Sequence, residues 1–334
     1  MIDIRNCPSS LKEGFDKYSP QAAKMLFGSS KVSPVLDFDI DDFRDVEAVA
    51  EAMHRISVSG VQEKFPAVID GNKIRIANND ERSTHILKPA PWDKTLRDRK
   101  AIPANEHLTM QIASQIYGIQ TAANGLCFTP TGQAVYITRR FDILPDGSKL
   151  PTEDFASLIG NNEQTAGLQF KYNGCYEDIA RAIKANVAAW MIDMERFFEL
   201  VVFNYIYANG DANLKNFSLI RKGQDYRLAP AYDLLNTSLH LNGDDLGLDG
   251  GLSPNIEKSD SLERTGHPCR VDFERFGEKI GLVKKRMDRI LDKYTIFPET
   301  AKCLVGHSFM SDKMKRNYAR IVNERICRFI RESE

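Results

Sequence analysis

Two carboxylates and two amides follow the most apolar stretch of the chain. Ten of the fourteen residues at 195–208 are apolar, and the residues after them include Asp211, Asn213 and Asn216, with Asp233 beyond a short hairpin. Such oxygen ligands suit Mg²⁺, whose coordination is usually completed by substrate phosphates. In kinases one Asp orients the attacking hydroxyl, while an Asn and a second Asp hold the metal. A turn capped by its own side chains has the same composition and, taken alone, is the simpler explanation.

Upstream of these carboxylates, a lysine and a segment of small residues are suited to bind phosphate. Lys88 ends an apolar segment from which its ammonium could reach a nucleotide, although a lone strand lysine more commonly lies at a solvated sheet edge. Glu106, near the start of the next expected helix, either pairs with Lys88 or complements the helix dipole. Residues 57–64 carry backbone N–H groups that could cover phosphates, or they form a plain surface turn. This segment matches neither GxxxxGK[ST] nor GxGxxG.

The elements expected to position these residues are strands first and helices later. The periodicity predicts a hairpin over 65–77, strands at 84–88 and 135–137, helices at 105–119 and 195–208, a second hairpin over 217–228 and charged amphipathic helices in the last hundred residues. The first hairpin is favoured because Asp70-Gly71 supplies the positive φ of a tight turn. The first 50 residues lack a sustained apolar period, and we expect them to form a loosely packed extension.

The composition limits the classes of protein to which the chain can belong. Its 334 residues, 42% hydrophobic and 27% charged, suffice for two packed lobes and exclude a peptide or a lone zinc module. The formal charge of −1 predicts no global attraction to nucleic acid or to an anionic membrane. The six cysteines include no CxxC pair, which argues against zinc ribbons and a disulfide framework. Without a basic-then-apolar leader or an apolar run of about 18 to 20 residues, we expect a cytoplasmic protein.

Six segments occur in an order that is informative as a set. They are SVSGVQEK at 57–64, THILKP at 84–89, NEHLTMQIA at 105–113, ITRRFD at 137–142, GDANLKNFSLI at 210–220 and LAPAYDLLN at 228–236. In these segments the chain resembles the HipA-like serine/threonine kinases, the toxins of bacterial toxin–antitoxin modules. The resemblance implies a two-lobed, protein-kinase-like α+β fold, with a small β-rich N-terminal lobe at 1–142 and a larger, mainly helical lobe at 143–334.

Carried over residue by residue, the resemblance implies a complete set of residues for phosphoryl transfer from ATP with Mg²⁺. Asp211 matches the catalytic Asp, Asn216 and Asp233 match the magnesium ligands, and Lys88 matches the phosphate-binding lysine. The other implied nucleotide-binding positions are Ser57, Val58, Ser59, Gly60, Gln62, Arg140, Phe141, Asn213 and Tyr232. We expect Lys88→Ala to weaken ATP use, with little loss of stability if the ammonium faces the cleft.

The resemblance also implies regulation and partners. In the family a serine of the nucleotide loop is phosphorylated by the kinase itself, which expels the loop and switches the enzyme off; Ser57 matches it, and Ser59 adds a second hydroxyl. Only 56 residues precede Ser57, as in the compact HipT-type form, in which a separate small protein supplies the N-terminal subdomain. The implied partners are that protein, a DNA-binding antitoxin and an aminoacyl-tRNA synthetase as substrate, with the tryptophanyl enzyme as the first choice. We expect no membrane partner and no direct nucleic-acid binding by the chain alone.

Two other functions remain open at this point. A small-molecule kinase of the aminoglycoside or choline type shares the Asp, Asn and Asp arrangement, but it predicts phosphorylation of a metabolite and no modification of a loop serine. A non-catalytic scaffold that binds an antitoxin is the second alternative. A scaffold has no need of Lys88, Asp211, Asn216 and Asp233 together, so the sequence favours a kinase.

Overall fold

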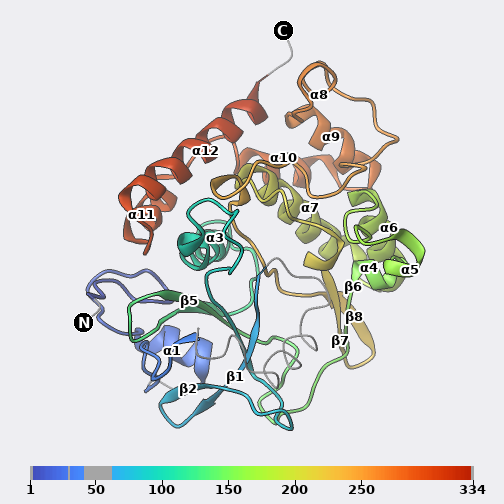
Figure 1. The fold of residues 1–334 in the computed structure, drawn as a ribbon. Helices are drawn as coiled ribbons and strands as arrows, with labels where there is room; N and C mark the ends of the chain where they lie inside the picture. Colours follow the sequence, from blue (N-terminus) through green and yellow to red (C-terminus); the bar gives the residue numbers. More distant parts are fainter. Residues whose placement is uncertain (1–2, 29–30, 41–61, 332–334) are drawn as a thin grey trace.

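The computed structural model describes residues 3–28, 31–40 and 62–331. A β-sheet formed by the first half of the chain lies beside a larger, mainly helical part formed by the second half (Figure 1). The fold is therefore α+β and two-lobed, as the sequence predicts. The predicted nucleotide-loop residues Ser57, Val58, Ser59 and Gly60 lie outside the described residues.

The N-terminal sheet has five antiparallel strands in the order β2-β1-β3-β5-β4. The strands are β1 (Phe65–Asp70), β2 (Lys73–Ile76), β3 (His85–Lys88), β4 (Asn124–Phe128) and β5 (Ala134–Arg139). The predicted 65–77 hairpin is confirmed as β1 and β2, and Gly71 takes the expected positive φ of 61°. Strand β3, which ends at Lys88, is the central strand of the sheet, so Lys88 does not lie on a sheet edge.

The two faces of this sheet pack against different segments. Because side chains alternate along a strand, Val135 and Ile137 of β5 face the N-terminal segment, whereas Tyr136 between them joins the core shared with the helical part. Helix α3 (Ile102–Gln115) packs on the Tyr136 side. Tyr136 is the register partner of Lys88, so the alternation places the lysine side chain on the same face as α3.

The expectation of a loosely packed N-terminal extension is wrong for the described residues. Helix α1 (Pro20–Phe27) covers the face of the sheet opposite α3, and Leu26 is fully buried there. The Tyr18 hydroxyl donates to the Leu126 carbonyl at 2.6 Å, and the Ser9 hydroxyl donates to the Asn124 carbonyl at 2.7 Å. Helix α1 spans only eight residues, and single residues outside it, such as Ser9 and Tyr18, supply the other contacts, so no sustained apolar period reveals this packing.

Two predicted helices exist with different ends. Helix α3 begins before the predicted residue 105, with Pro103 in its first turn, a position that tolerates the missing N–H. It ends before the predicted 119, because Gly118 adopts a left-handed φ of 69° and the Ile119 N–H donates to the Ala113 carbonyl, which closes the helix. The buried helix predicted at 195–208 is α7 (Trp190–Ile206), which starts five residues earlier.

The second half of the chain holds a small sheet and most of the helices. Its three antiparallel strands, in the order β6-β7-β8, are β6 (Thr152–Asp154), β7 (Ser218–Lys222) and β8 (Asp225–Leu228). Its other α-helices are α4 (Phe155–Leu158), α5 (Glu163–Ala166), α6 (Tyr176–Asn186), α8 (Asp260–Thr265), α9 (Arg270–Lys279), α10 (Lys284–Asp292), α11 (Glu299–His307) and α12 (Asp312–Ile330). The predicted second hairpin and the C-terminal helices are thus confirmed, whereas β4 and β6 were not predicted.

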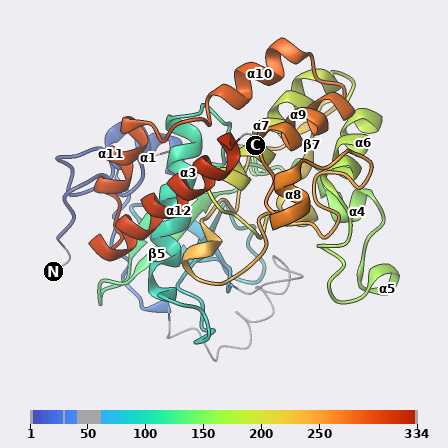
Figure 2. The same cartoon turned by 90° about the horizontal axis from the view of Figure 1, so that it is seen from above.

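The core of the helical part continues into the N-terminal half. Tyr136 and Phe128 belong to the same buried cluster as Phe203 of α7 and Tyr318 of α12. Viewed from above, α12 lies across α3 (Figure 2), and the Tyr318 hydroxyl lies 2.9 Å from that of Thr109. The domain boundary between 1–142 and 143–334 stays a prediction. None of the helices in the described ranges has the length and apolar content needed to cross a membrane.

Two buried histidines tie the N-terminal segment to the rest and predict a pH dependence of stability. His107 Nε2 lies 2.7 Å from the Ser9 carbonyl, and His85 Nε2 lies 2.9 Å from the Leu26 carbonyl. Burial lowers the pKa of each to about 4. Since the unfolded chain binds these protons near pH 6.5, the stability contributed by the neutral rings is complete above that pH and is lost as the pH falls toward 4.

We expect His107→Gln to flatten the fall in the free energy of unfolding between pH 6.5 and pH 4, by up to about 1.4 kcal/mol per pH unit. Glutamine keeps a donor for the Ser9 carbonyl but does not titrate. Urea unfolding of both proteins at a series of pH values measures the difference. Parallel curves for the wild type and the variant would contradict this account of His107.

Candidate functional site

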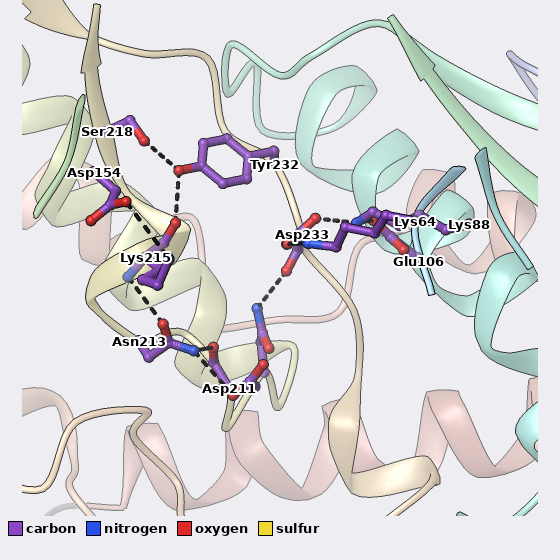
Figure 3. A network of polar contacts seen from close by, with 11 residues as sticks. Lys64, Lys88, Glu106, Asp154, Asp211, Asn213, Lys215, Ser218, Tyr232 and Asp233 are labelled. Atoms are coloured by element: carbon purple, nitrogen blue, oxygen red, sulfur yellow. Dashed lines mark hydrogen bonds and ion pairs between the residues drawn. The ribbon is translucent and has the colours of Figure 1, made fainter. Parts of the chain in front are cut away.

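A buried ammonium group joins two carboxylates at the centre of the molecule. Lys88 Nζ donates to Glu106 Oε1 at 2.6 Å and also contacts Asp233 Oδ1 (Figure 3). Only 4% of the Lys88 side chain and 1% of the Glu106 side chain are exposed. A buried charge is tolerated only when it is paired, so each of these groups depends on the others. The predicted pairing of Lys88 with Glu106 is confirmed, and the solvated-edge alternative for Lys88 is wrong.

Burial and ion pairing shift the pKa values of these three groups in different directions. Burial opposes the ammonium, but Asp233 and Glu106 outweigh it and raise the pKa of Lys88 above its ordinary value. Burial raises the pKa of Glu106 to about 7, with Lys88 opposing and Asp233 adding to the shift. Burial also acts on Asp233, but the two cations Lys64 and Lys88 hold its pKa well below the usual range. Asp233 is therefore the carboxylate that stays charged throughout the neutral range.

Lys64 is a member of the site that the sequence analysis did not single out. Its Nζ lies 3.4 Å from Asp233 Oδ2, the oxygen that Lys88 leaves free. Two positions earlier, the Gln62 amide donates to the Pro89 carbonyl at 3.0 Å, directly after Lys88. Both contacts place the end of the predicted nucleotide segment, 57–64, beside the buried Lys88. The sequence could have indicated Lys64, because it is the last residue of that segment.

The backbone at Asp233 is strained. Its φ of 55° is in the left-handed region, which residues other than glycine seldom adopt. The Asp233 carbonyl accepts a hydrogen bond from the Asn209 side chain at 3.2 Å, while the carboxylate is held by the two lysines. Such conformations persist where the surroundings over-determine them, which is a common property of functional sites.

Asp211 lies in a loop that leaves one of its carboxylate oxygens open. Oδ1 accepts a hydrogen bond from the Tyr172 hydroxyl at 2.7 Å. It also accepts one from the Asn213 side chain at 3.1 Å (Figure 3). No residue in the described ranges donates to Oδ2. A carboxylate fixed through one oxygen and open at the other can accept a proton from a hydroxyl group. Tyr172 was missed, because it lies 39 residues before Asp211 and no local pattern connects them.

Asn213 and Tyr232 hold the same loop from its other side. Asn213 Oδ1 accepts from the Lys215 N–H at 3.0 Å and caps the 3-10 helix η3 (Leu214–Asn216). The Tyr232 hydroxyl donates to the Lys215 carbonyl at 2.9 Å and lies 2.5 Å from the Ser218 hydroxyl. Asn213 is 1% exposed, so its amide serves the loop. The nucleotide-contacting roles expected of Asn213 and Tyr232 stay predictions.

Arg140 and Phe141 connect the sheet to this region. The Arg140 guanidinium forms a two-pronged ion pair with Asp142, at 3.0 and 2.7 Å, and donates to the Ser83 hydroxyl at 3.1 Å. The Phe141 ring stacks on Tyr232 with ring centroids 5.7 Å apart. The charge of Arg140 is therefore neutralised by Asp142. Of the two residues, Phe141 is the one that contacts Tyr232, directly before Asp233. The implied nucleotide-binding role stays a prediction for both.

The donor set suits magnesium better than a transition metal. Within the described ranges, no three His, Cys, Asp or Glu side chains cluster as a metal-binding group. Mg²⁺ needs fewer protein ligands than such a cluster, because it retains water and uses substrate phosphates. Asp233 is anionic, and no described residue hydrogen-bonds the side chain of Asn216, at the end of η3. Both side chains offer the oxygen donors that Mg²⁺ takes, and their role as its ligands stays a prediction.

Comparisons with known sequences point to one family. The family model described as HipA-like C-terminal domain matches residues 56–300. A protein of Haemophilus influenzae named "Putative kinase" is 26% identical over 319 residues, which cover 91% of this chain and 90% of that protein. "Putative kinase Y4mE" of Sinorhizobium fredii is 29% identical over 254 residues, which cover 71% of this chain but only 55% of that relative's length.

Solved structures share the fold. The HipA toxin of Shewanella oneidensis, solved with HipB and operator DNA, superposes with a TM-score of 0.63 at 18% identity, covering 82% of this chain and 65% of that one. The Helicobacter pylori proinflammatory kinase CtkA superposes with a TM-score of 0.50 at 14% identity, covering 80% of this chain and 91% of that one. At these identities the likeness concerns the fold, and the fold is that of kinases.

The expectation of little loss of stability applied to an ammonium that faces the cleft, whereas Lys88 is buried and paired. Removing the ammonium leaves Glu106 and Asp233 facing each other without their shared cation. We expect Lys88→Met to lower the free energy of unfolding by about 3–5 kcal/mol, which is typical of breaking a buried ion pair. The double variant Lys88→Met/Glu106→Gln should lose less than the sum of the single changes, because no unpaired Glu106 charge remains.

Lys222→Met is the matched control for this cycle. Lys222 is an exposed lysine at the end of β7, and its loss should change stability by no more than about 0.5 kcal/mol. Denaturant unfolding at pH 8 of the wild type, the two single variants Lys88→Met and Glu106→Gln, the double variant and the control measures all the differences. A Lys88→Met variant as stable as Lys222→Met would show that the buried ion pairs do not contribute to the free energy of unfolding.

Proposed function

The chain belongs to the HipA-like family, and on that premise we propose that it is a serine/threonine protein kinase that uses ATP and Mg²⁺. One observation carries the proposal: the buried Lys88 joins Asp233 to Glu106, while the open oxygen of Asp211 lies in the adjoining loop. A cation for phosphates, a carboxylate for metal and a second carboxylate for a hydroxyl are the parts that phosphoryl transfer requires. The structure supports this combination more directly than any single motif does.

Each side chain has a distinct role in this proposal. Asp211 Oδ2 accepts the proton of the acceptor hydroxyl, while Tyr172 holds Oδ1 and thereby fixes the direction of the carboxylate. Lys88 and Lys64 supply positive charge where phosphate oxygens approach. Asp233 and Asn216 would hold Mg²⁺, which neutralises charge on the transferred group. As the resemblance implies, residues 57–62 would cover the phosphates, and Arg140 and Phe141 would lie beside the base.

The physiological role follows from the family resemblance. We infer that the kinase is the toxin of a bacterial toxin–antitoxin module of the compact HipT type and acts in the cytoplasm. Its substrate is an aminoacyl-tRNA synthetase, with the tryptophanyl enzyme as the first choice, and phosphorylation adds about −1.5 to −2 charges that block translation. A DNA-binding antitoxin and a small separate subdomain protein are its partners. The Shewanella structure with HipB supports the antitoxin part of this inference.

Replacing either carboxylate should abolish phosphoryl transfer while the fold survives. We expect Asp211→Asn and Asp233→Asn each to lower turnover at least about 100-fold, because one loses the proton acceptor and the other loses the charge that holds the metal. Asp225→Asn, in an exposed position of β8, is the matched control and should keep wild-type activity. The assay is transfer of label from γ-labelled ATP to proteins of a cell extract. Wild-type rates in either site variant would refute the assignment.

Autophosphorylation should occur on Ser57 or Ser59 and should inhibit the enzyme. A dianion on a loop that covers nucleotide phosphates creates like-charge repulsion, and displacement of the loop relieves it. Intact-mass and peptide analysis of the active protein, beside Asp211→Asn, should find phosphate on these serines in the active form alone. If the protein stays unmodified after long incubation with magnesium and ATP, the regulatory proposal is wrong. In the label-transfer assay, label found only on metabolites would instead favour a small-molecule kinase.

A further inference from the structure

The hydroxyl group of Thr237 holds the backbone that leads into Asp211. Thr237 begins the 3-10 helix η4 (Thr237–Leu239) and is 6% exposed. Its Oγ1 accepts a hydrogen bond from the Gly210 N–H at 2.9 Å and donates to the Ala208 carbonyl at 3.0 Å. The Thr237 N–H donates to the same carbonyl at 3.0 Å. One buried threonine therefore satisfies a donor and an acceptor on either side of Asn209.

The segment that Thr237 holds is strained and has no room to relax. Ala208 adopts a left-handed φ of 54°, which is unfavourable for any residue except glycine. A Cβ atom on Gly210 would lie 2.5 Å from the Asp244 carbonyl oxygen, so the loop backbone already touches another backbone there. Such a turn persists only where neighbouring groups fix it, and the Thr237 hydroxyl is the side-chain group that bonds both of its ends.

Thr237 is itself anchored to the helix that carries Glu106. The buried side chain of Asn105 accepts from the Asn236 N–H at 3.1 Å and donates to the Asn236 carbonyl at 2.9 Å. Asn236 directly precedes Thr237, and Asn105 directly precedes Glu106. The position of the hydroxyl is thus fixed relative to the buried ion pair, and not only relative to its own loop.

We propose that Thr237 is a positioning residue. Through the two hydrogen bonds of its hydroxyl to Ala208 and Gly210, it sets the distance between the carboxylate of Asp211 and the proposed metal ligand Asp233. Thr237 lies four positions after Asp233, so a single short segment carries one carboxylate and orients the loop of the other. Thr237 touches no reacting atom in this arrangement. The inference rests on the proposed kinase function for its kinetic consequence, while its structural part stands on the hydrogen bonds alone.

The test compares Thr237→Val with Thr237→Ser. Valine keeps the shape of threonine but removes the hydroxyl, and serine keeps the hydroxyl. We expect Thr237→Val to lower kcat for label transfer from γ-labelled ATP about 10- to 100-fold, with the KM for ATP within about twofold of the wild type, since misplacement affects the transfer step and not nucleotide binding. Thr237→Ser should restore kcat to within about threefold. Thr265→Val, which removes an exposed hydroxyl bond on α8, is the matched control and should change neither constant.

Hydrogen exchange of the Gly210 amide supplies a readout that does not depend on catalysis. The Gly210 N–H should exchange at least about tenfold faster in Thr237→Val than in the wild type and in Thr237→Ser, because its acceptor is gone. If the wild type transfers no phosphoryl group, the proposed function fails, whereas the exchange rates still decide the positioning role. Thr237→Ala provides the same comparison if the valine variant does not fold. Wild-type kcat, or unchanged Gly210 exchange, in the hydroxyl-free variants would overturn the proposal.

Discussion

A single buried ammonium group is the constraint on which the site depends. Lys88 lies on the central strand of the sheet, where water cannot stabilise its charge, so the fold must bring carboxylates to it. One comes from α3 and the other from the loop after β8, and these segments are far apart in the sequence. The ion pairs therefore unite sheet, helix and loop at one point, and the cost of leaving the ammonium unpaired maintains that arrangement.

Strained backbone conformations also occur at the site. Within the described ranges, four residues other than glycine have positive φ. Two of them belong to the site: Ala208 lies three positions before Asp211, and the other is Asp233 itself. Asn209 connects the two strained positions, because its side chain donates to the Asp233 carbonyl at 3.2 Å. Strain at these positions means that neither carboxylate reached its place through local preference alone. Hydrogen bonds and ion pairs from distant segments hold both against it.

The fold could be predicted from the sequence wherever a local pattern determined an element. The 65–77 hairpin followed from its turn residues, and α7 followed from its apolar length. Strand β4 was not predicted because it begins with Asn-Gly, residues that disfavour strands. It forms where the N-terminal segment packs against Gly125, a contact that the local sequence does not reveal. Glu106 was expected as a partner of Lys88. Tyr172 and Thr237 could not be predicted as partners, because they act through contacts that only the tertiary structure creates.

Helix α3 shows how one short segment can organise such a site. Successive residues of an α-helix point about 100° apart, so three in a row face three directions. Asn105 binds the backbone after Asp233, Glu106 pairs with Lys88, and His107 reaches the carbonyl of Ser9 in the N-terminal segment. All three side chains are almost completely buried, which a surface helix could not accommodate. Burial of three consecutive polar side chains is costly unless each gains a hydrogen bond or an ion pair. The partners that supply these bonds lie in the loop, the sheet and the N-terminal segment, so α3 fixes the three segments relative to one another.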